Sequence, residues 1–171
     1  MDKSAGQLCR PGALDPVKVN GKIVVCLRGD NPLIEKGKTV RLVGRVGIIL
    51  CNDLQGDPTI VVTVYGLPSA QLSATDGAAV FGYINSTQSP VASIDDQPTM
   101  LNIRPAPVMA SLSSKGPNPI IPDILKPDIT APGVNILAAY TEAEVSIPSV
   151  PFYIPSGTSM ACPMLLVLRL Y

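Results

Sequence analysis

Residues 157–163 read Gly-Thr-Ser-Met-Ala-Cys-Pro and place one serine, Ser159, where a loop is expected to become a helix. Gly157 allows the backbone to approach another chain closely, and amide groups in the first turn of a helix have no partner within the helix. Such amides can help to hold an oxyanion beside a nucleophilic serine. Pro163 is expected in the first helical turn, where the N–H that proline lacks would have no acceptor.

The same stretch has a simpler interpretation. A Gly-Thr-Ser string alone is most often a helix N-cap, in which Thr158 or Ser159 accepts a hydrogen bond from the first turn. A reactive serine also needs a base, commonly histidine, which a third group orients. The sequence contains no histidine. The motif therefore indicates a chemistry that these residues cannot complete.

Two further motifs precede this stretch and favour the nucleophile interpretation. Residues 111–118 read Ser-Leu-Ser-Ser-Lys-Gly-Pro-Asn, and residues 125–139 read Leu-Lys-Pro-Asp-Ile-Thr-Ala-Pro-Gly-Val-Asn-Ile-Leu-Ala-Ala. In this order, the motifs resemble the C-terminal part of the subtilisin-like serine proteases, and among them the plant subtilases. Residues 15–29, Asp-Pro-Val-Lys-Val-Asn-Gly-Lys-Ile-Val-Val-Cys-Leu-Arg-Gly, are similar to the protease-associated (PA) domain inserted in plant subtilases. Residues from about 9 to 163 share the resemblance.

This resemblance implies a PA domain over residues 1–98 and part of a subtilisin-like peptidase domain over residues 99–171. The implied activity is that of a serine endopeptidase on protein or peptide substrates, with Ser159 as the nucleophile that forms the acyl-enzyme. In the family, the catalytic Asp and His and the oxyanion-hole Asn precede the PA insert. None of them maps onto this sequence, so the chain alone is expected to be inactive. The alternative is a non-catalytic PA module for protein interaction or self-association.

The sequence predicts a mixed α/β fold that begins with a compact, β-rich PA domain containing two short helices. Apolar and β-branched runs between turn residues predict strands, and helical spacing with a capping serine predicts helices. Gly77 is expected to weaken the second helix by about 1 kcal/mol relative to Ala. The expected elements are strands at 21–27, 46–50 and 90–94 and helices at 35–43 and 73–83.

The second half is expected to contain an incomplete part of the family's parallel α/β sheet. Residues 106–110 and 134–139 are its expected strands, and most of the helices that would cover a parallel sheet are missing. Residues 165–171 are expected to form an apolar helix without its partners. Asp128 lies in a Lys-Pro-Asp turn and is interpreted as a structural residue, not as the acid of a catalytic triad.

Composition indicates a globular chain and excludes several classes of function. Hydrophobic residues make up 46% and charged residues 15%, and 13 Lys and Arg balance 13 Asp and Glu. Without a basic cluster, nucleic acid is not an expected partner. No apolar run is long enough to cross a bilayer. Because histidine and Cys-x-x-Cys spacing are both absent, a metal site is not expected. No other cofactor is expected.

The expected location is extracellular, in the cell wall or apoplast, because the resembled family is usually secreted. The first seven residues lack the apolar core of a signal peptide. We therefore expect a fragment or truncated gene model of a secreted precursor, with an intracellular remnant as the alternative. Residues 85–87, Asn-Ser-Thr, form an N-glycosylation sequon. An ordinary asparagine at a helix end is the alternative for Asn85.

The four cysteines, Cys9, Cys26, Cys51 and Cys162, allow three fully paired connectivities. In the PA region of the resembled family, the positions of Cys9 and Cys26 look disulfide-bonded. The resemblance therefore implies a Cys9–Cys26 bridge. Four reduced thiols are the alternative for a chain that stays in the cytosol.

Overall fold

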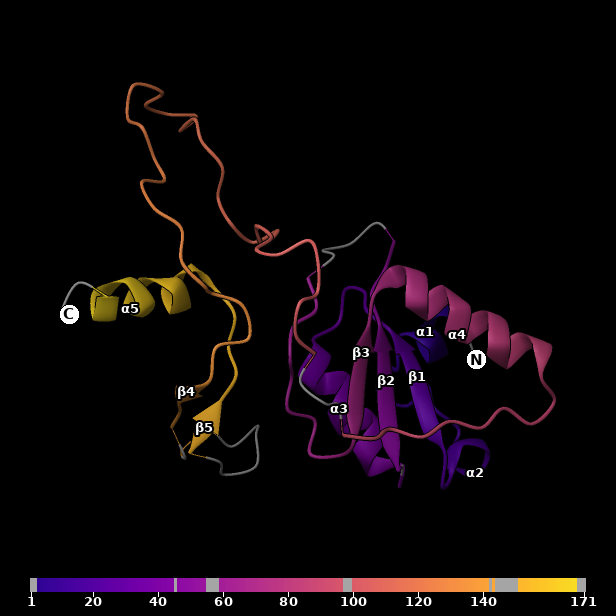
Figure 1. Ribbon diagram of the computed structural model, residues 1–171. Helices are drawn as coiled ribbons and strands as arrows, with labels where there is room; N and C mark the ends of the chain where they lie inside the picture. The colour runs from indigo at the N-terminus through magenta and orange to yellow at the C-terminus, as the bar shows by residue number, and fades with distance from the viewer. Residues whose placement is uncertain are drawn as a thin grey trace.

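The structure, a computed structural model, describes residues 3–44, 46–54, 59–96, 100–141, 143 and 151–168. In chain order, the elements are α1 (Lys3–Gln7), α2 (Pro16–Val19), β1 (Ile23–Leu27), α3 (Leu33–Leu42), β2 (Gly47–Cys51), β3 (Ser69–Leu72), α4 (Ala74–Ser86), β4 (Ala138–Ala139), β5 (Phe152–Tyr153) and α5 (Thr158–Leu168). Figure 1 shows the elements from α1 to α4 gathered into one packed body, whereas β4, β5 and α5 follow a long connecting segment. The predicted mixed α/β class is confirmed.

Three parallel strands in the order β1-β2-β3 form the main sheet. β2 lies in the centre, and all of its residues are buried, as expected of a parallel strand that is covered on both faces. The predicted strands at 21–27 and 46–50 are confirmed with small shifts at their ends. β3 is absent from the prediction because its residues, Ser-Ala-Gln-Leu, include no β-branched or aromatic side chain.

Different helices cover the two faces of the sheet, since alternate residues of a strand point to opposite faces. One face, with α3, forms the hydrophobic core of Cys9, Val24, Cys26, Val40, Ile48, Leu50 and Tyr65. On the other face, a Cβ added at Gly77 of α4 would lie 2.6 Å from Cys51 Cβ. Gly77 therefore lets α4 lie directly against β2, which is a packing role that the sequence prediction does not include.

The predicted disulfide between Cys9 and Cys26 is confirmed, with the two Cα atoms 5.7 Å apart. Both residues are fully buried in the core, so the bridge fastens the loop after α1 to strand β1. Cys51 is free and buried, and its burial raises the pKa of the thiol. Cys162 is free and exposed on α5.

Both predicted helices of the first half are confirmed as α3 and α4. α4 begins after Ser73, whose Oγ accepts a hydrogen bond from the Asp76 amide at 3.1 Å and donates one to the Asp76 carboxylate at 2.7 Å. This is the arrangement expected of a serine N-cap. The short helices α1 and α2 are additional; α2 starts with an Asp15 cap followed by Pro16.

The predicted closing strand at 90–94 is wrong, because these residues form no strand. Pro90 has no N–H to donate. The Val91 amide donates to Tyr83 Oη at 3.1 Å, and Tyr83 Oη donates to the Val91 carbonyl at 3.3 Å. The backbone N–H and C=O of Val91 therefore bond to a side chain and not to a neighbouring strand. The segment still belongs to the first half, because Ile94 packs against Gly47 at the start of β2.

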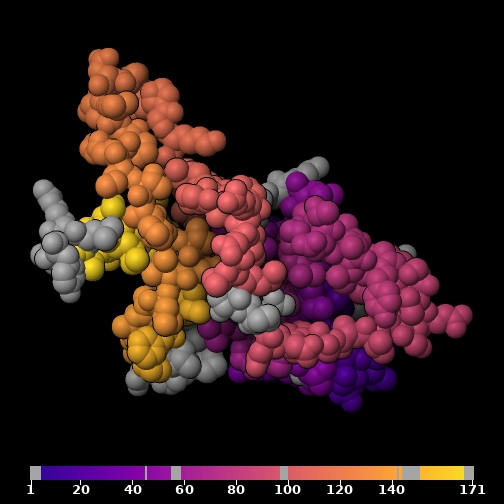
Figure 2. Space-filling model, viewed as in Figure 1, coloured from indigo at the N-terminus to yellow at the C-terminus, as the bar shows by residue number. Residues whose placement is uncertain are grey.

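The second half differs most from the prediction. Residues 106–110 form no strand; Pro105 and Pro107 lack an N–H, and Val108 and Met109 are exposed. Within 134–139 only β4 forms, and it pairs with β5 in an antiparallel register, so the parallel sheet expected after residue 99 is not found among the described residues. None of the described residues from 100 onward is buried. Figure 2 shows the orange part of this segment projecting as an arm.

Lys36 of α3 is fully buried beside the disulfide loop. Its Nζ donates to the Leu8 carbonyl at 2.7 Å and to Asn31 Oδ1, so it ties α3 to the residue before Cys9. Desolvation by burial lowers the pKa of Lys36 to about 8, with Arg10 also lowering it and with Asp30 and Glu35 opposing the shift. The folded chain therefore holds this proton less tightly than the unfolded chain does.

We expect the free energy of unfolding to rise by on the order of 1 kcal/mol between pH 7 and pH 9 through Lys36 alone. The sign follows because the unfolded state binds more protons than the folded state above pH 8, and stability then increases with pH. Urea unfolding at both pH values measures this change in wild type and in Lys36→Met, which should lose it. Lys38→Met removes an exposed lysine of the same helix and should keep the rise in the free energy of unfolding between pH 7 and pH 9. An equal pH dependence in both variants would contradict the assignment.

Candidate active site

Ser159 is exposed and lies in the first turn of α5. The Gly157 carbonyl accepts from the amides of Met160 at 3.0 Å and Ala161 at 3.3 Å. Gly157 therefore occupies the N-cap position, and Thr158 and Ser159 lie inside the helix instead of capping it. The first-turn amide of Ser159 has no acceptor within the helix and is suited to donate to an anion beside the hydroxyl.

Pro163 is not in the first turn, contrary to the sequence prediction. α5 begins at Thr158, which places Pro163 inside the helix. A proline there lacks the N–H that would bond to the carbonyl four residues earlier, which is Ser159. The apolar helix expected over residues 165–171 is found as far as Leu168, as the end of α5, and residues 169–171 lie outside the described residues. Its outer face is uncovered, because the side chains of Met164, Leu166 and Val167 are between 41% and 58% exposed.

Gly133, in the Ala-Pro-Gly part of the preceding motif, holds the residue before this helix. Its carbonyl accepts from the Gly157 amide at 2.7 Å. A Cβ added at Gly133 would lie 2.8 Å from the Gly157 carbonyl oxygen and 3.1 Å from Ala161 Cβ. The two motifs are therefore in direct contact, and only a glycine at 133 allows it.

Asn135 makes a second connection to the same loop. Its amide donates to Ser156 Oγ at 2.8 Å, and Ser156 Oγ donates to Asn135 Oδ1 at 3.3 Å. The amide of the next residue, Ile136, bonds to the Pro155 carbonyl at 2.9 Å. Asn135 has φ 53°, a left-handed conformation that asparagine tolerates better than most residues. Sequence reasoning assigns no role to this residue.

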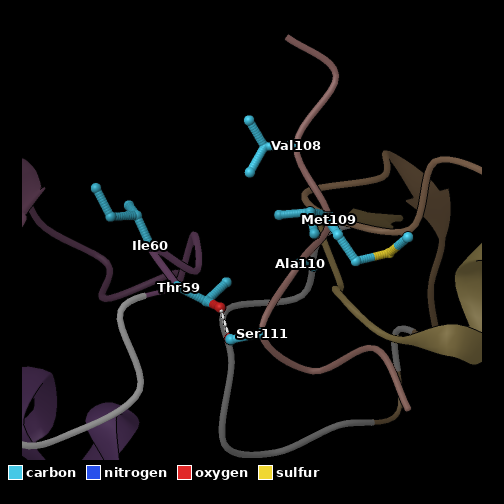
Figure 3. A pocket seen from close by; sticks show the side chains of 7 residues that line it. Thr59, Ile60, Val108, Met109, Ala110 and Ser111 are labelled. Atoms are coloured by element: carbon cyan, nitrogen blue, oxygen red, sulfur yellow. Dashed lines mark hydrogen bonds between the residues drawn. The ribbon is translucent and has the colours of Figure 1, made fainter. Parts of the chain in front are cut away.

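A cavity of about 360 Å³ lies between the two halves of the chain. Thr59 and Ile60 line one side, and residues 108–111 and Val134 line the other. Figure 3 shows the hydrogen bond between Thr59 Oγ1 and Ser111 Oγ, with Ile60 and Val108 on opposite sides. Ser159 is not part of its lining, so the cavity and the nucleophile position are separate features.

The remaining sequence candidates have clear positions. Asp128 forms an exposed ion pair with Lys126, and these residues adopt no regular turn, so the turn predicted at Lys-Pro-Asp is not found. Asn85 of the sequon is exposed in the last turn of α4, where Ser86 Oγ donates to the Tyr83 carbonyl at 3.0 Å.

Over the described ranges, no group of three or more His, Cys, Asp or Glu side chains could hold a metal ion. Over the same ranges, no helix is long and apolar enough to cross a membrane.

The sequence was compared with models of protein families and with curated proteins. Residues 3–80 match the family described as PA domain, so the chain carries a PA domain. The chain is 49% identical over 162 residues to "Subtilisin-like protease SBT5.4" of Arabidopsis thaliana, a match that covers 91% of the chain and 21% of the relative. "Subtilisin-like protease SBT5.3" of the same plant is 48% identical, and the match covers 92% of the chain and 21% of that relative. "Subtilisin-like protease SBT1.6" is 46% identical, and the match covers 94% of the chain and 22% of that relative.

The chain is therefore homologous to a segment of the plant subtilisin-like proteases that includes their PA domain. It spans about a fifth of the length of these curated relatives. The resemblance drawn from the three ordered motifs and from residues 15–29 is confirmed.

Proposed function

We propose that Ser159 is the nucleophile of a subtilisin-like serine endopeptidase that acts on protein substrates. The observation that carries the proposal is the exposed Ser159 in the first turn of α5, within a motif held by Gly133 and Asn135. Ser159 Oγ attacks the scissile carbonyl as a base takes its proton, the peptide C–N bond breaks, and the amine leaves with that proton. Water then hydrolyses the ester of the acyl-enzyme and frees the serine hydroxyl. The first-turn amide of Ser159 supplies one donor to the oxyanion. Homology to proteases over most of the chain supports this role.

The base and its orienting acid are proposed to come from polypeptide outside these 171 residues, because the sequence contains no histidine. Loss of the catalytic histidine costs subtilisin about 10⁶-fold in turnover. The 171-residue chain alone is therefore proposed to be inactive. The buried Cys9–Cys26 disulfide supports an oxidising, extracellular location, since such bridges persist mainly outside the cytosol.

The 171-residue chain is expected to show no labelling by a fluorophosphonate probe above that of Ser159→Ala. Without a base, the hydroxyl stays protonated and reacts too slowly to be seen. Gel fluorescence after incubation of both proteins with the probe measures this. Labelling of the wild type that Ser159→Ala abolishes would show that the chain holds a base of its own.

The nucleophile assignment is tested separately in a chimera. Residues 1–171 replace the matching segment of SBT5.4, which supplies the rest of the protease chain. We expect the chimera to be labelled and to cleave a protein substrate, and Ser159→Ala in the chimera to abolish both. Ser156→Ala changes a neighbouring serine hydroxyl and should leave labelling detectable. Unchanged labelling in the Ser159→Ala chimera would defeat the proposal.

A second candidate function is a non-catalytic PA module with residues 1–98 as its folded unit. The observation in its favour is that every buried hydrophobic residue of the described ranges lies between Cys9 and Tyr65. Limited proteolysis is expected to remove the exposed second half and to leave a resistant fragment that ends after Ile94. Light scattering during size-exclusion chromatography then tests self-association. A resistant fragment that retains Ser159 would contradict the boundary, and a monomer would remove self-association as a function.

A further inference from the structure

The segment Thr59–Val62, here called the strap, lies inside the PA domain between β2 and β3 and contacts Asn135 in the second half of the chain. Its first residue is bound at the carboxyl ends of β1 and β2. Arg28 Nη1 donates to the Thr59 carbonyl at 3.0 Å, and Asn52 Nδ2 donates to the same oxygen at 3.4 Å. Asn52 is almost fully buried, and its Oδ1 accepts from Gln71 Nε2 at 3.1 Å. The main sheet therefore determines where the strap begins.

Asn135 joins the strap to the loop before α5 through one side chain. Its Oδ1 accepts from the Val62 amide at 3.1 Å, and its Nδ2 donates to the Ile60 carbonyl at 3.4 Å. The same Oδ1 accepts from Ser156 Oγ at 3.3 Å, and the Asn135 amide donates to that hydroxyl at 2.8 Å. One amide group thus bridges two segments that are more than 70 residues apart in sequence.

The chemistry of these contacts selects asparagine. Glycine would adopt φ 53° as readily but would have no side chain to bind the strap. Aspartate could accept from Val62 and Ser156 but could not donate to the Ile60 carbonyl. Asparagine alone combines an acceptor, a donor and tolerance of the left-handed conformation.

The bridge ends close to the nucleophile. Ser156 directly precedes Gly157, whose carbonyl starts α5 and whose amide is held by Gly133. The loop is therefore held on one side by Gly133 and on the other by Asn135. Asn135 therefore contacts the chain at Ser156, three residues before Ser159.

We infer that Asn135 is a positioning residue that couples the PA domain to the nucleophile segment, by binding the strap and Ser156 at the same time. The role toward Ser159 rests on the proposed function. The coupling itself does not depend on catalysis. It predicts that, in the 171-residue chain, loss of the Asn135 side chain loosens both the strap and the first turn of α5.

Amide hydrogen exchange, followed by NMR on the 171-residue chain, tests the coupling without any catalysis. In Asn135→Gly, the backbone conformation is kept and the side-chain contacts are lost. We expect exchange at Val62 to accelerate about tenfold, as for one lost hydrogen bond of about 1.4 kcal/mol. Exchange at Met160 and Ala161, which bond to Gly157, should accelerate with it. Asn135→Asp, which keeps the acceptor, should restore protection at Val62.

The matched control is Asn118→Gly, because Asn118 Oδ1 accepts from the amides of Ile120 and Ile121 within its own turn. This variant should leave Val62, Met160 and Ala161 unchanged. Unaltered exchange at Val62 in Asn135→Gly would overturn the inference. A change at Val62 without one at Met160 and Ala161 would also overturn it, because the strap would then be bound without any effect on α5.

The chimera described above separates this inference from the proposed function. There Asn135→Gly should lower the maximal rate of fluorophosphonate labelling and leave the half-saturating probe concentration unchanged. Restoration by Asn135→Asp would support positioning, and an unchanged maximal rate would overturn the role toward Ser159. If the chimera with Asn135 intact is not labelled at all, the proposed function fails, while the exchange measurements still decide the coupling.

Discussion

Removal of the Cys9–Cys26 disulfide is expected to lower the free energy of unfolding by about 3 kcal/mol. The bridge closes a loop with a sequence separation of 17, and a loop of that size is expected to contribute about this amount by restricting the unfolded chain. Both cysteines are fully buried, so reduction also leaves two thiols in the core. Because small domains are stable by only 5–15 kcal/mol, this is one of the largest single contributions available.

The measurement is urea unfolding of the double variant Cys9→Ala/Cys26→Ala against wild type, with and without reducing agent. Cys162→Ser removes an exposed free thiol and should be neutral. If the double variant does not fold, the wild-type midpoint in reducing agent provides the comparison. An equal midpoint in oxidised and reduced wild type would contradict the prediction.

Replacement of Gly77 by alanine is expected to destabilise the PA domain by up to about 2 kcal/mol. A Cβ there would lie 2.6 Å from Cys51 Cβ and 3.0 Å from Cys51 Sγ, so α4 must move away from β2. Overpacking of this kind costs about 1–3 kcal/mol, and the gain of about 1 kcal/mol in helix propensity offsets only part of it.

Gly82 of the same helix is the matched control. A Cβ there meets nothing within 4 Å, so Gly82→Ala should stabilise the protein by up to about 1 kcal/mol. Thermal unfolding of the two variants should therefore shift the midpoint in opposite directions. A stabilising effect of Gly77→Ala would show that α4 does not rest on Cys51.

The elements that could be predicted from sequence are those with local signals. β1 and β2 are runs of apolar and β-branched residues between turn residues, and α4 follows a serine cap. The disulfide came from family resemblance, because four cysteines alone leave three connectivities open. The strand predicted at 90–94 failed because the Tyr83 hydroxyl, and not a neighbouring strand, binds Val91.

The candidate site was predictable only in part. Ser159 and its helix start could be found because a short motif carries them. Asn135 could not be assigned a role, since its partners Ile60, Val62 and Ser156 lie in two distant segments. The one local signal was an asparagine after Gly133 and Val134, a residue type that tolerates the left-handed conformation.

By itself, the sequence determined the mixed α/β class, the two strands β1 and β2, the capped start of α4 and the placement of Ser159 in a first helical turn. Each of these depends on hydrogen bonds or periodicity within a few residues. Only the tertiary structure decided that β1, β2 and β3 pair in parallel, that Gly77 lies against Cys51, that β4 and β5 pair antiparallel, and that Asn135 joins the strap to the nucleophile loop. Such contacts depend on how segments far apart in the sequence pack against one another, and a local pattern of residues does not specify that packing.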